Sequence, residues 1–111
     1  MKNEEPLAIT PEPPYYAVIF STIRTEGDNG YELMAEKMAA LAATMPGYLG
    51  ADSARNEVGI TVSYWKDLDS IKNWKYQSDH AMARDMGREF WYQAYQLRIA
   101  KVERQYGFEK R

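Results

Sequence analysis

The hydrophobic and polar positions follow two different periods in the first half of the chain. The segment from Tyr15 to Arg24 is rich in aromatic and β-branched residues and lies between Pro14 and a polar run, which predicts a strand. A helix is expected next, because Asn29 and Glu32 resemble a capping box. Apolar residues then recur at helical spacing: Leu33, Met34, Met38, Leu41 and Met45. The pair Pro46-Gly47 ends this predicted helix.

The second half repeats this alternation. Tyr48 to Arg55 and Val58 to Trp65 are predicted as two strands of a hairpin, joined by Asn56-Glu57. Asp67 is a suitable N-cap for a second helix. Its apolar positions are Leu68, Ile71 and Trp74. A separate helical stretch, capped by Ser78 or Asp79, is expected to run through Met82, Met86 and Phe90. The last predicted strand is Tyr92 to Val102, so the order is the β-α-β-β-α-β of an α+β, ferredoxin-like fold.

One folded domain is expected over residues 15–108, between an N-terminal arm and a short tail at 109–111. Residues 1–14 hold four of the five prolines, at positions 6, 11, 13 and 14. Because proline resists both helix and central strand, this segment is predicted to be an extended arm that buries little.

Both faces of the first predicted strand are apolar. Tyr16, Val18 and Phe20 alternate with Ala17, Ile19 and Ile23. The helices of a ferredoxin-like domain cover one sheet face only, so the other would be left as a large exposed apolar patch. The sequence therefore predicts a homodimer in which two sheets pack face to face.

The composition narrows the classes of function. The 111 residues carry a net charge of −2 with both signs interspersed, which does not fit a nucleic-acid partner. No apolar run approaches the roughly 20 residues of a membrane span, and no leader-like apolar segment is found near the N-terminus, so a cytoplasmic protein without a membrane partner is expected. With no cysteine and one histidine, neither a disulfide nor a nitrogen- or sulfur-rich metal site is expected.

Four segments carry a resemblance to a known family. They are PGYLG at 46–50, GITVSYW at 59–65, IKNWKYQSDH at 71–80 and RIAKVERQYGF at 98–108. In this order they resemble the antibiotic biosynthesis monooxygenase family over roughly residues 15 to 108. The resemblance implies a dimeric α/β barrel with a pocket in each subunit between sheet and helices. Some members of that family oxygenate phenolic or quinol-like molecules without a cofactor, and others bind and degrade haem.

Several side chains suit cofactor-free oxygenation, which needs an apolar pocket, a proton acceptor and hydrogen bonds to a phenolate. Trp65 and Trp74 offer flat walls, and His80 is the only side chain that ordinarily titrates near neutrality. Arg84, four residues after His80, is suited to steadying an anion. Further donors are predicted from Ser63, Asn73 and Tyr76.

Each of these residues also has a purely structural interpretation. The two tryptophans would then be core residues, His80 a solvated residue on a helix, and Arg84 a member of a surface ion pair. Three functions remain open from the sequence. They are a cofactor-independent monooxygenase of an aromatic, phenolic or quinol-like molecule, a haem-binding or haem-degrading monooxygenase with His80 as axial ligand, and a non-catalytic dimeric binder of small molecules.

Overall fold

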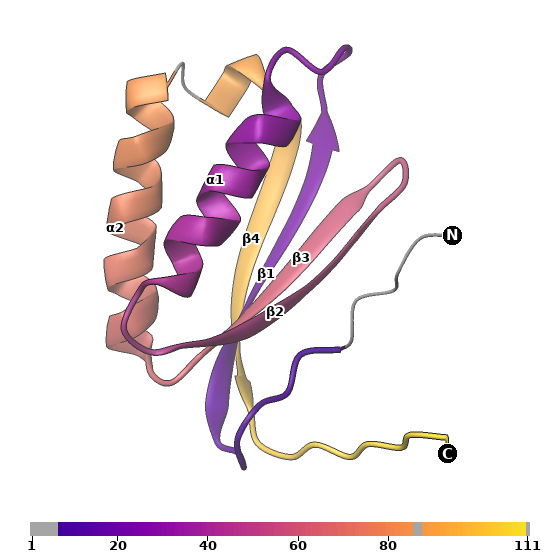
Figure 1. The fold of residues 1–111 in the computed structure, drawn as a ribbon, viewed down its shortest axis with the longest axis vertical. Coiled ribbons are helices and arrows are strands. Elements are labelled where there is room, and N and C mark those ends of the chain that lie inside the picture. The colour runs from indigo at the N-terminus through magenta and orange to yellow at the C-terminus, as the bar shows by residue number, and fades with distance from the viewer. Residues whose placement is uncertain (1–6, 86–87, 111) are drawn as a thin grey trace.

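The computed structural model describes residues 7–85 and 88–110, with the side chains of 83–85 and 88 left out. The chain forms strand β1 (Tyr15–Arg24), helix α1 (Tyr31–Ala43), strands β2 (Tyr48–Arg55) and β3 (Gly59–Trp65), helix α2 (Leu68–Asp85), a 3-10 turn (Arg88–Phe90) and strand β4 (Tyr92–Val102). The strands form one sheet in the order β2-β3-β1-β4, with every neighbouring pair antiparallel. Figure 1 shows both helices side by side on one face of this sheet. The predicted α+β, ferredoxin-like fold is confirmed.

Two local expectations differ from the structure. The predicted break near Ser78 is absent, because α2 continues from Leu68 to Asp85 as one helix, and Met86 lies outside the described residues. Asn29 is not the capping side chain of α1 either. Asp28 accepts hydrogen bonds from the amides of Gly30, at 3.0 Å, and Glu32, at 3.2 Å, whereas the Asn29 amide group donates to the Glu26 carbonyl at 3.0 Å. Aspartate serves this position well because its carboxylate accepts from two of the amides that a helix start leaves unpaired.

Gly47 allows α1, β2 and the start of α2 to meet. Its φ is +87°, and a Cβ at this position would overlap the Ser70 Oγ. Its carbonyl accepts from the Lys66 amide at 2.8 Å, and Asp67 caps α2 by accepting from the Ser70 amide at 2.8 Å. A side chain at residue 47 would therefore be strained by the backbone and would push α2 away from the sheet.

The helix-facing side of the sheet carries two separate apolar clusters. One is formed by Val18, Ala42, Trp65 and Ile71, with half-buried side chains around them that include Tyr48 and Trp74. We call it the tryptophan core. The second is formed by Met34, Met82 and Trp91, packed with Tyr31, Met38 and Tyr92. The first lies near the N-terminal end of β1 and the second near its C-terminal end, because Tyr16 pairs with Trp65 while Arg24 pairs with Tyr92.

The opposite side of the sheet is covered by neither helix, and we call it the open face. The register places Ile19, Val62 and Ile60 on it, and Ile60 and Ile23 remain 44% and 46% exposed. The expectation that the two faces of β1 are both apolar is met, with Ile19 and Ile23 on this side.

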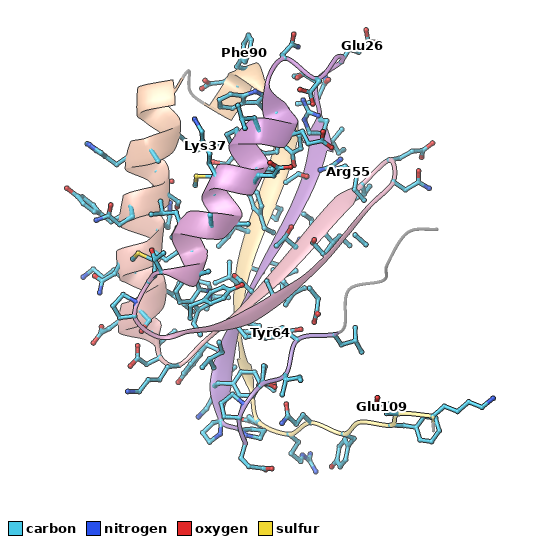
Figure 2. All side chains as sticks on the ribbon, in the orientation of Figure 1. Glu26, Lys37, Arg55, Tyr64, Phe90 and Glu109 are labelled. Carbon is cyan, nitrogen blue, oxygen red and sulfur yellow. The ribbon has the colours of Figure 1, made fainter. Side chains whose placement is uncertain are left out.

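Residues 7–14 form neither helix nor strand, yet they are more engaged than the sequence predicts. The Ala8 amide donates to Asp52 Oδ1 at 2.8 Å, and Tyr64, which Figure 2 labels, donates to Asp52 Oδ2 at 2.9 Å. Thr10 bonds to the Tyr15 hydroxyl at 2.9 Å, and Gln105 bonds to both of these residues and to the Pro11 carbonyl. This network leaves Tyr15 only 4% exposed.

Candidate functional site

Three of the predicted site residues come together in the tryptophan core. Trp65 is completely buried and donates its indole N–H to Ser63 Oγ at 2.9 Å. Its ring stacks on that of Trp74 with centroids 5.9 Å apart, and Tyr48 meets it edge-on at 5.4 Å. A fully buried ring whose polar atom already has a partner has no free surface for a ligand. Trp65 and Ser63 therefore support the sheet, and only the half-buried Trp74 keeps an accessible edge.

The other predicted residues are not brought to that core. Asn73, Tyr76 and His80 are exposed and recur along α2 at spacings of three and four, so they share its outward side. The His80 and Tyr76 rings stack with centroids 6.3 Å apart, and Tyr76 is 68% exposed. Arg84 lies within α2, and its side chain is outside the described residues.

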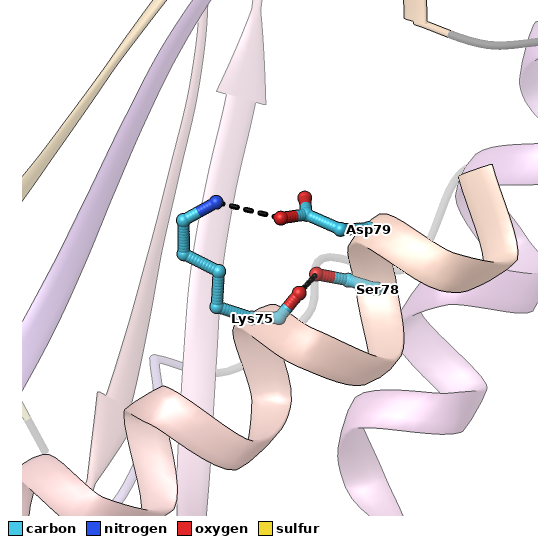
Figure 3. Close-up of polar contacts among 3 residues, drawn as sticks. All are labelled: Lys75, Ser78 and Asp79. Carbon is cyan, nitrogen blue, oxygen red and sulfur yellow. Dashed lines mark hydrogen bonds and ion pairs between the residues drawn. The ribbon is translucent and has the colours of Figure 1, made fainter. Parts of the chain in front are cut away.

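The neighbouring turn of α2 carries an ion pair and a hydrogen bond at the surface. Lys75 Nζ pairs with Asp79 Oδ2 at 2.7 Å, and Ser78 Oγ donates to the Lys75 carbonyl at 3.1 Å, as Figure 3 shows. Both members of the ion pair are about half exposed, at 58% and 45% of their side chains. Such pairs contribute roughly 0–1 kcal/mol to stability and do not build a site.

A second group of side chains has the features of a site. Six residues form it, and we call it the tyrosine–arginine cluster: Phe20, Arg24, Tyr31, Arg55, Tyr92 and Tyr95. The Phe20 ring lies 5.7 Å from that of Tyr92 and 5.4 Å from that of Tyr95, and the two tyrosine rings are 6.0 Å apart. Tyr31, at the start of α1, meets Tyr92 edge-on at 5.7 Å. Two phenol groups thus lie against the Phe20 ring, and the third, from α1, lies against Tyr92.

Two guanidinium groups approach Tyr31 in this cluster. The Arg24 Cζ lies 3.6 Å from the centre of the Tyr31 ring, and the Arg55 Cζ lies 5.8 Å from it. Both distances are within the range of cation–π attraction. Within residues 7–85 and 88–110, no carboxylate forms an ion pair with either arginine. The cluster is therefore aromatic and locally positive.

The two arginines differ in how many of their donors are used. Arg24 donates to three backbone carbonyls, those of Trp91 at 2.9 Å, Gly27 at 3.2 Å and Asp28 at 3.3 Å. Arg55 has one described acceptor, the hydroxyl of the buried Thr22. A guanidinium has five N–H groups, so Arg24 is held as a structural tie while Arg55 keeps most of its donors for another partner.

The position of Arg55 follows from the sheet register. Arg55, Gly59, Thr22 and Tyr95 form one row of paired residues across β2, β3, β1 and β4. A Cβ at Gly59 would overlap the Arg55 guanidinium, so glycine at this position lets the side chain lie flat across β3 and reach β1. Figure 2 labels Arg55 on the β2–β3 hairpin.

The electrostatics of the cluster act on Tyr92. Burial raises the pKa of this phenol strongly, and the adjacent Tyr31, through its partial charge and a hydrogen bond, raises it further. Arg55 and Arg24 act in the opposite direction and favour the phenolate. Tyr92 therefore stays protonated at neutral pH and is a hydrogen-bond donor, while the arginines provide a field that stabilises an anion placed beside them.

An open pocket of about 250 Å³ adjoins the cluster. It is lined by Glu89, Tyr92, Gln93, Ala94 and Tyr95, so two of the phenols border it. Tyr95 is 42% exposed, which leaves part of its ring accessible. The pocket lies where β4 begins, at the 3-10 turn that precedes this strand.

Sequence reasoning missed this cluster, since its members lie far apart in the chain and none belongs to a recognisable motif. The only available signal was an aromatic strand together with a predicted hairpin in which Arg55 ends the first strand and Gly59 lies near the start of the second. In the part of the chain that the structure describes, no three acidic or histidine side chains are arranged to hold a metal ion. None of the described helices is long and apolar enough to span a membrane.

Solved structures of other proteins share this fold. The structure of SnoaB from Streptomyces nogalater, a cofactor-independent oxygenase, superposes with a TM-score of 0.70 at 11% identity, covering 84% of this chain and 97% of that one. A Bordetella bronchiseptica protein provisionally assigned to the antibiotic biosynthesis monooxygenases superposes with a TM-score of 0.63 at 16% identity, over 81% and 98% of the two chains. PA3566 from Pseudomonas aeruginosa gives 0.64 at 15% identity, over 86% and 98%. The chain thus has the antibiotic biosynthesis monooxygenase fold, as its sequence motifs predicted.

A closer relative is found in sequence. The chain is 50% identical over 106 residues to the uncharacterised protein YqjZ of Bacillus subtilis, covering 94% of this chain and 93% of the relative. The chain belongs to the same family as YqjZ. No protein-family model matches it.

Proposed function

We propose that this protein is a cofactor-independent monooxygenase of a phenolic or quinol-like aromatic molecule, which binds at the tyrosine–arginine cluster. The observation that carries the proposal is the open pocket beside Tyr92 and Tyr95, in a cluster that also holds two guanidinium groups without a carboxylate partner among the described residues. The fold shared with SnoaB is consistent with this chemistry.

The reaction asks for few protein groups. A deprotonated phenol is electron-rich enough to transfer electrons to dioxygen. Conversion of an aromatic C–H opposite the phenol to a quinone carbonyl uses one molecule of dioxygen. One of its oxygen atoms enters the product and the other leaves as water, so the substrate supplies all four electrons. The protein must bind the ring, exclude bulk water and stabilise the phenolate.

The cluster supplies two of these functions, ring binding and phenolate stabilisation, through distinct residues. Phe20 and Tyr95 offer ring surfaces, and Tyr92 is a protonated donor. Arg55 stabilises a nearby phenolate, and this lowers the pKa of the substrate phenol toward neutral pH. His80, the proton acceptor predicted from the sequence, lies on the outward side of α2, so substrate acidity beside Arg55 replaces it in this proposal.

We further propose that the working unit is a homodimer joined through the open face. The open face carries exposed isoleucines. In addition, four apolar side chains of the terminal segments are 79% to 91% exposed: Leu7, Ile9, Tyr106 and Phe108. A second copy placed on this face would remove both sets from water. The cytoplasmic location expected from the sequence stays a prediction.

Haem does not fit the described surroundings of the one candidate ligand. An axial histidine must project into an apolar slot that covers the porphyrin. His80 is exposed, with the ring of the exposed Tyr76 stacked beside it, on the outward side of α2. The position of His80 therefore does not support haem ligation, and a Soret band that shifts on adding hemin to the wild type but not to His80→Ala would overturn this conclusion.

Oxygen consumption tests the proposal. The wild type should consume dioxygen with at least one member of a panel of anthrones and 1-naphthols, which carry a C–H opposite the oxygen, with the quinone formed in equal amount. Tyr92→Phe, which keeps the ring and removes the donor, should lower kcat/KM by roughly 10- to 100-fold. Tyr76→Phe is the matched control on the outward side of α2 and should be unchanged. Binding of the panel without oxygen consumption would instead identify a non-catalytic binder.

A further inference from the structure

The free donors of Arg55 indicate what kind of substituent the ligand carries. Arg55 belongs to the cluster on which the proposed function rests, and it differs from Arg24 in having one described acceptor where Arg24 has three. Its guanidinium lies over Gly59 and donates to the Thr22 hydroxyl. A guanidinium held in this way is prepared for a planar anion with two oxygen atoms.

The surroundings favour an anion that is attached to an aromatic ring. The Tyr31 ring contacts both guanidinium groups and the Tyr92 phenol, with distances from its centre of 3.6 Å and 5.8 Å to the Cζ atoms of Arg24 and Arg55, and of 5.7 Å to the centre of the Tyr92 ring. Phe20 and Tyr95 extend this aromatic surface toward the open pocket. A ligand ring that lies along these side chains would bring a ring substituent toward Arg55.

The charges around the pocket also favour a ligand with an anionic group. Both arginines act on Tyr92 to favour its anionic form, so their field reaches the phenol that borders the pocket. The pocket also contains one carboxylate, that of Glu89, in the 3-10 turn that precedes β4. Opposite charges at the two ends of the site would orient a ligand with its anionic group toward Arg55 and away from Glu89.

We propose that the substrate is a hydroxylated aromatic carboxylic acid, and that Arg55 binds its carboxylate. Arg55 is a binding residue in this arrangement, and Gly59 and Thr22 are the positioning residues that hold it. This inference rests on the proposed function only for the location of the site, because carboxylate binding can be measured without any oxygenation.

The test is a binding measurement under nitrogen. The probes are 1-hydroxy-2-naphthoate and its carboxamide, which have the same ring and differ in charge, and binding is followed by calorimetry at low ionic strength. The wild type should bind the carboxylate about 10- to 100-fold more tightly than the carboxamide, which is the worth of a charge-assisted pair of hydrogen bonds.

Variants locate this preference. Arg55→Gln should bind both probes equally, with the affinity of the wild type for the carboxamide, and Arg55→Lys should recover part of the preference because it keeps the charge and loses the planar fork. Lys37→Gln removes the same charge from an exposed position on α1 and should leave both affinities unchanged. Melting curves of all variants check that they are folded.

The outcomes separate this inference from the proposed function. Equal affinity of the wild type for the two probes, or a preference that survives in Arg55→Gln, overturns carboxylate recognition. Carboxylate preference without oxygen consumption by any phenol supports the inference and overturns the monooxygenase. Oxygen consumption in the wild type that Arg55→Gln leaves intact, together with a lost carboxylate preference, supports the inference and the oxygenation but overturns the part of the proposed function that assigns phenolate stabilisation to Arg55.

Discussion

The guanidinium of Arg55 lies across Gly59 and donates to the hydroxyl of Thr22, two strands away from its own. Thr22 is 4% exposed, so Arg55 is the partner that satisfies a buried hydroxyl as well as the cation of the candidate site. The position of this side chain is thus fixed by the absence of a side chain at residue 59.

Gly59→Ala is expected to displace Arg55 without unfolding the domain. The new Cβ would overlap the end of a flexible side chain, which can move into solvent. The Thr22 hydroxyl would lose its partner, at a cost of roughly 1 kcal/mol that the better strand propensity of alanine partly offsets. We expect carboxylate binding to fall as far as in Arg55→Gln, while the free energy of unfolding changes by about 1 kcal/mol or less. Unchanged binding would show that Arg55 does not need this position.

The stability of the protein is expected to fall steeply in alkali. Burial, the hydrogen bond to Asp52 and the charge of that carboxylate raise the pKa of Tyr64 to about 12. An unfolded tyrosine titrates near 10. The folded state therefore holds this proton more tightly, so the contribution is complete below pH 10 and is lost as pH rises from about 10 toward 12.

Urea denaturation at pH 9, 10 and 11 would measure this loss. Tyr64→Phe should show a smaller decline in the free energy of unfolding over this range, since the phenol with the raised pKa is gone. Tyr76→Phe should decline like the wild type, because it removes a phenol that is 68% exposed. Equal slopes for the wild type and Tyr64→Phe would contradict the assignment.

The fold was predictable from the sequence, since periodicity acts locally. The bounds of β1, β2 and β4 agree with the predicted strands, and Asp67 caps α2 as expected. The site was harder to predict because it depends on register. Trp65 and Trp74 do meet, yet Trp65 is entirely buried, and the phase of α2 turns His80 outward. Arg55 and Thr22 are 33 residues apart and meet through two strand pairings that no local pattern specifies.

His80→Ala separates the site predicted from the sequence from the site seen in the structure. If His80 were the general base, its removal would lower turnover by roughly 100- to 10,000-fold. Since His80 is exposed beside Tyr76, we expect less than a twofold change in kcat on a substrate found in the oxygen assay. The free energy of unfolding should change by no more than about 0.5 kcal/mol. A loss of 100-fold in kcat with normal folding would restore His80 as the base.

Removal of residues 1–13 is expected to destabilise the domain, contrary to what the proline content alone suggests. Asp52 would lose the Ala8 amide, and Tyr15 and Gln105 would lose Thr10 and Pro11. The melting temperature should fall by more than about 8 °C, on the order of 1–2 kcal/mol for a domain of this size. Thr10→Ala, which removes one hydroxyl of the network, should give a smaller decrease. A truncated chain that melts within 2 °C of the wild type would show that these hydrogen bonds add little.

Two isoleucines of similar exposure test the proposed dimer. Ile60 is 44% exposed on the open face, and Ile99, paired with Val18 on the helix-facing side, is 48% exposed. Light scattering of the wild type at micromolar concentration should give twice the mass of one chain. Ile60→Asp should dissociate the dimer, because a charge buried between two sheets without a partner costs several kcal/mol. Ile99→Asp introduces the same charge away from that interface and should remain dimeric. A wild type with the mass of a single chain, or an equal effect of the two substitutions, would exclude the open face as the interface.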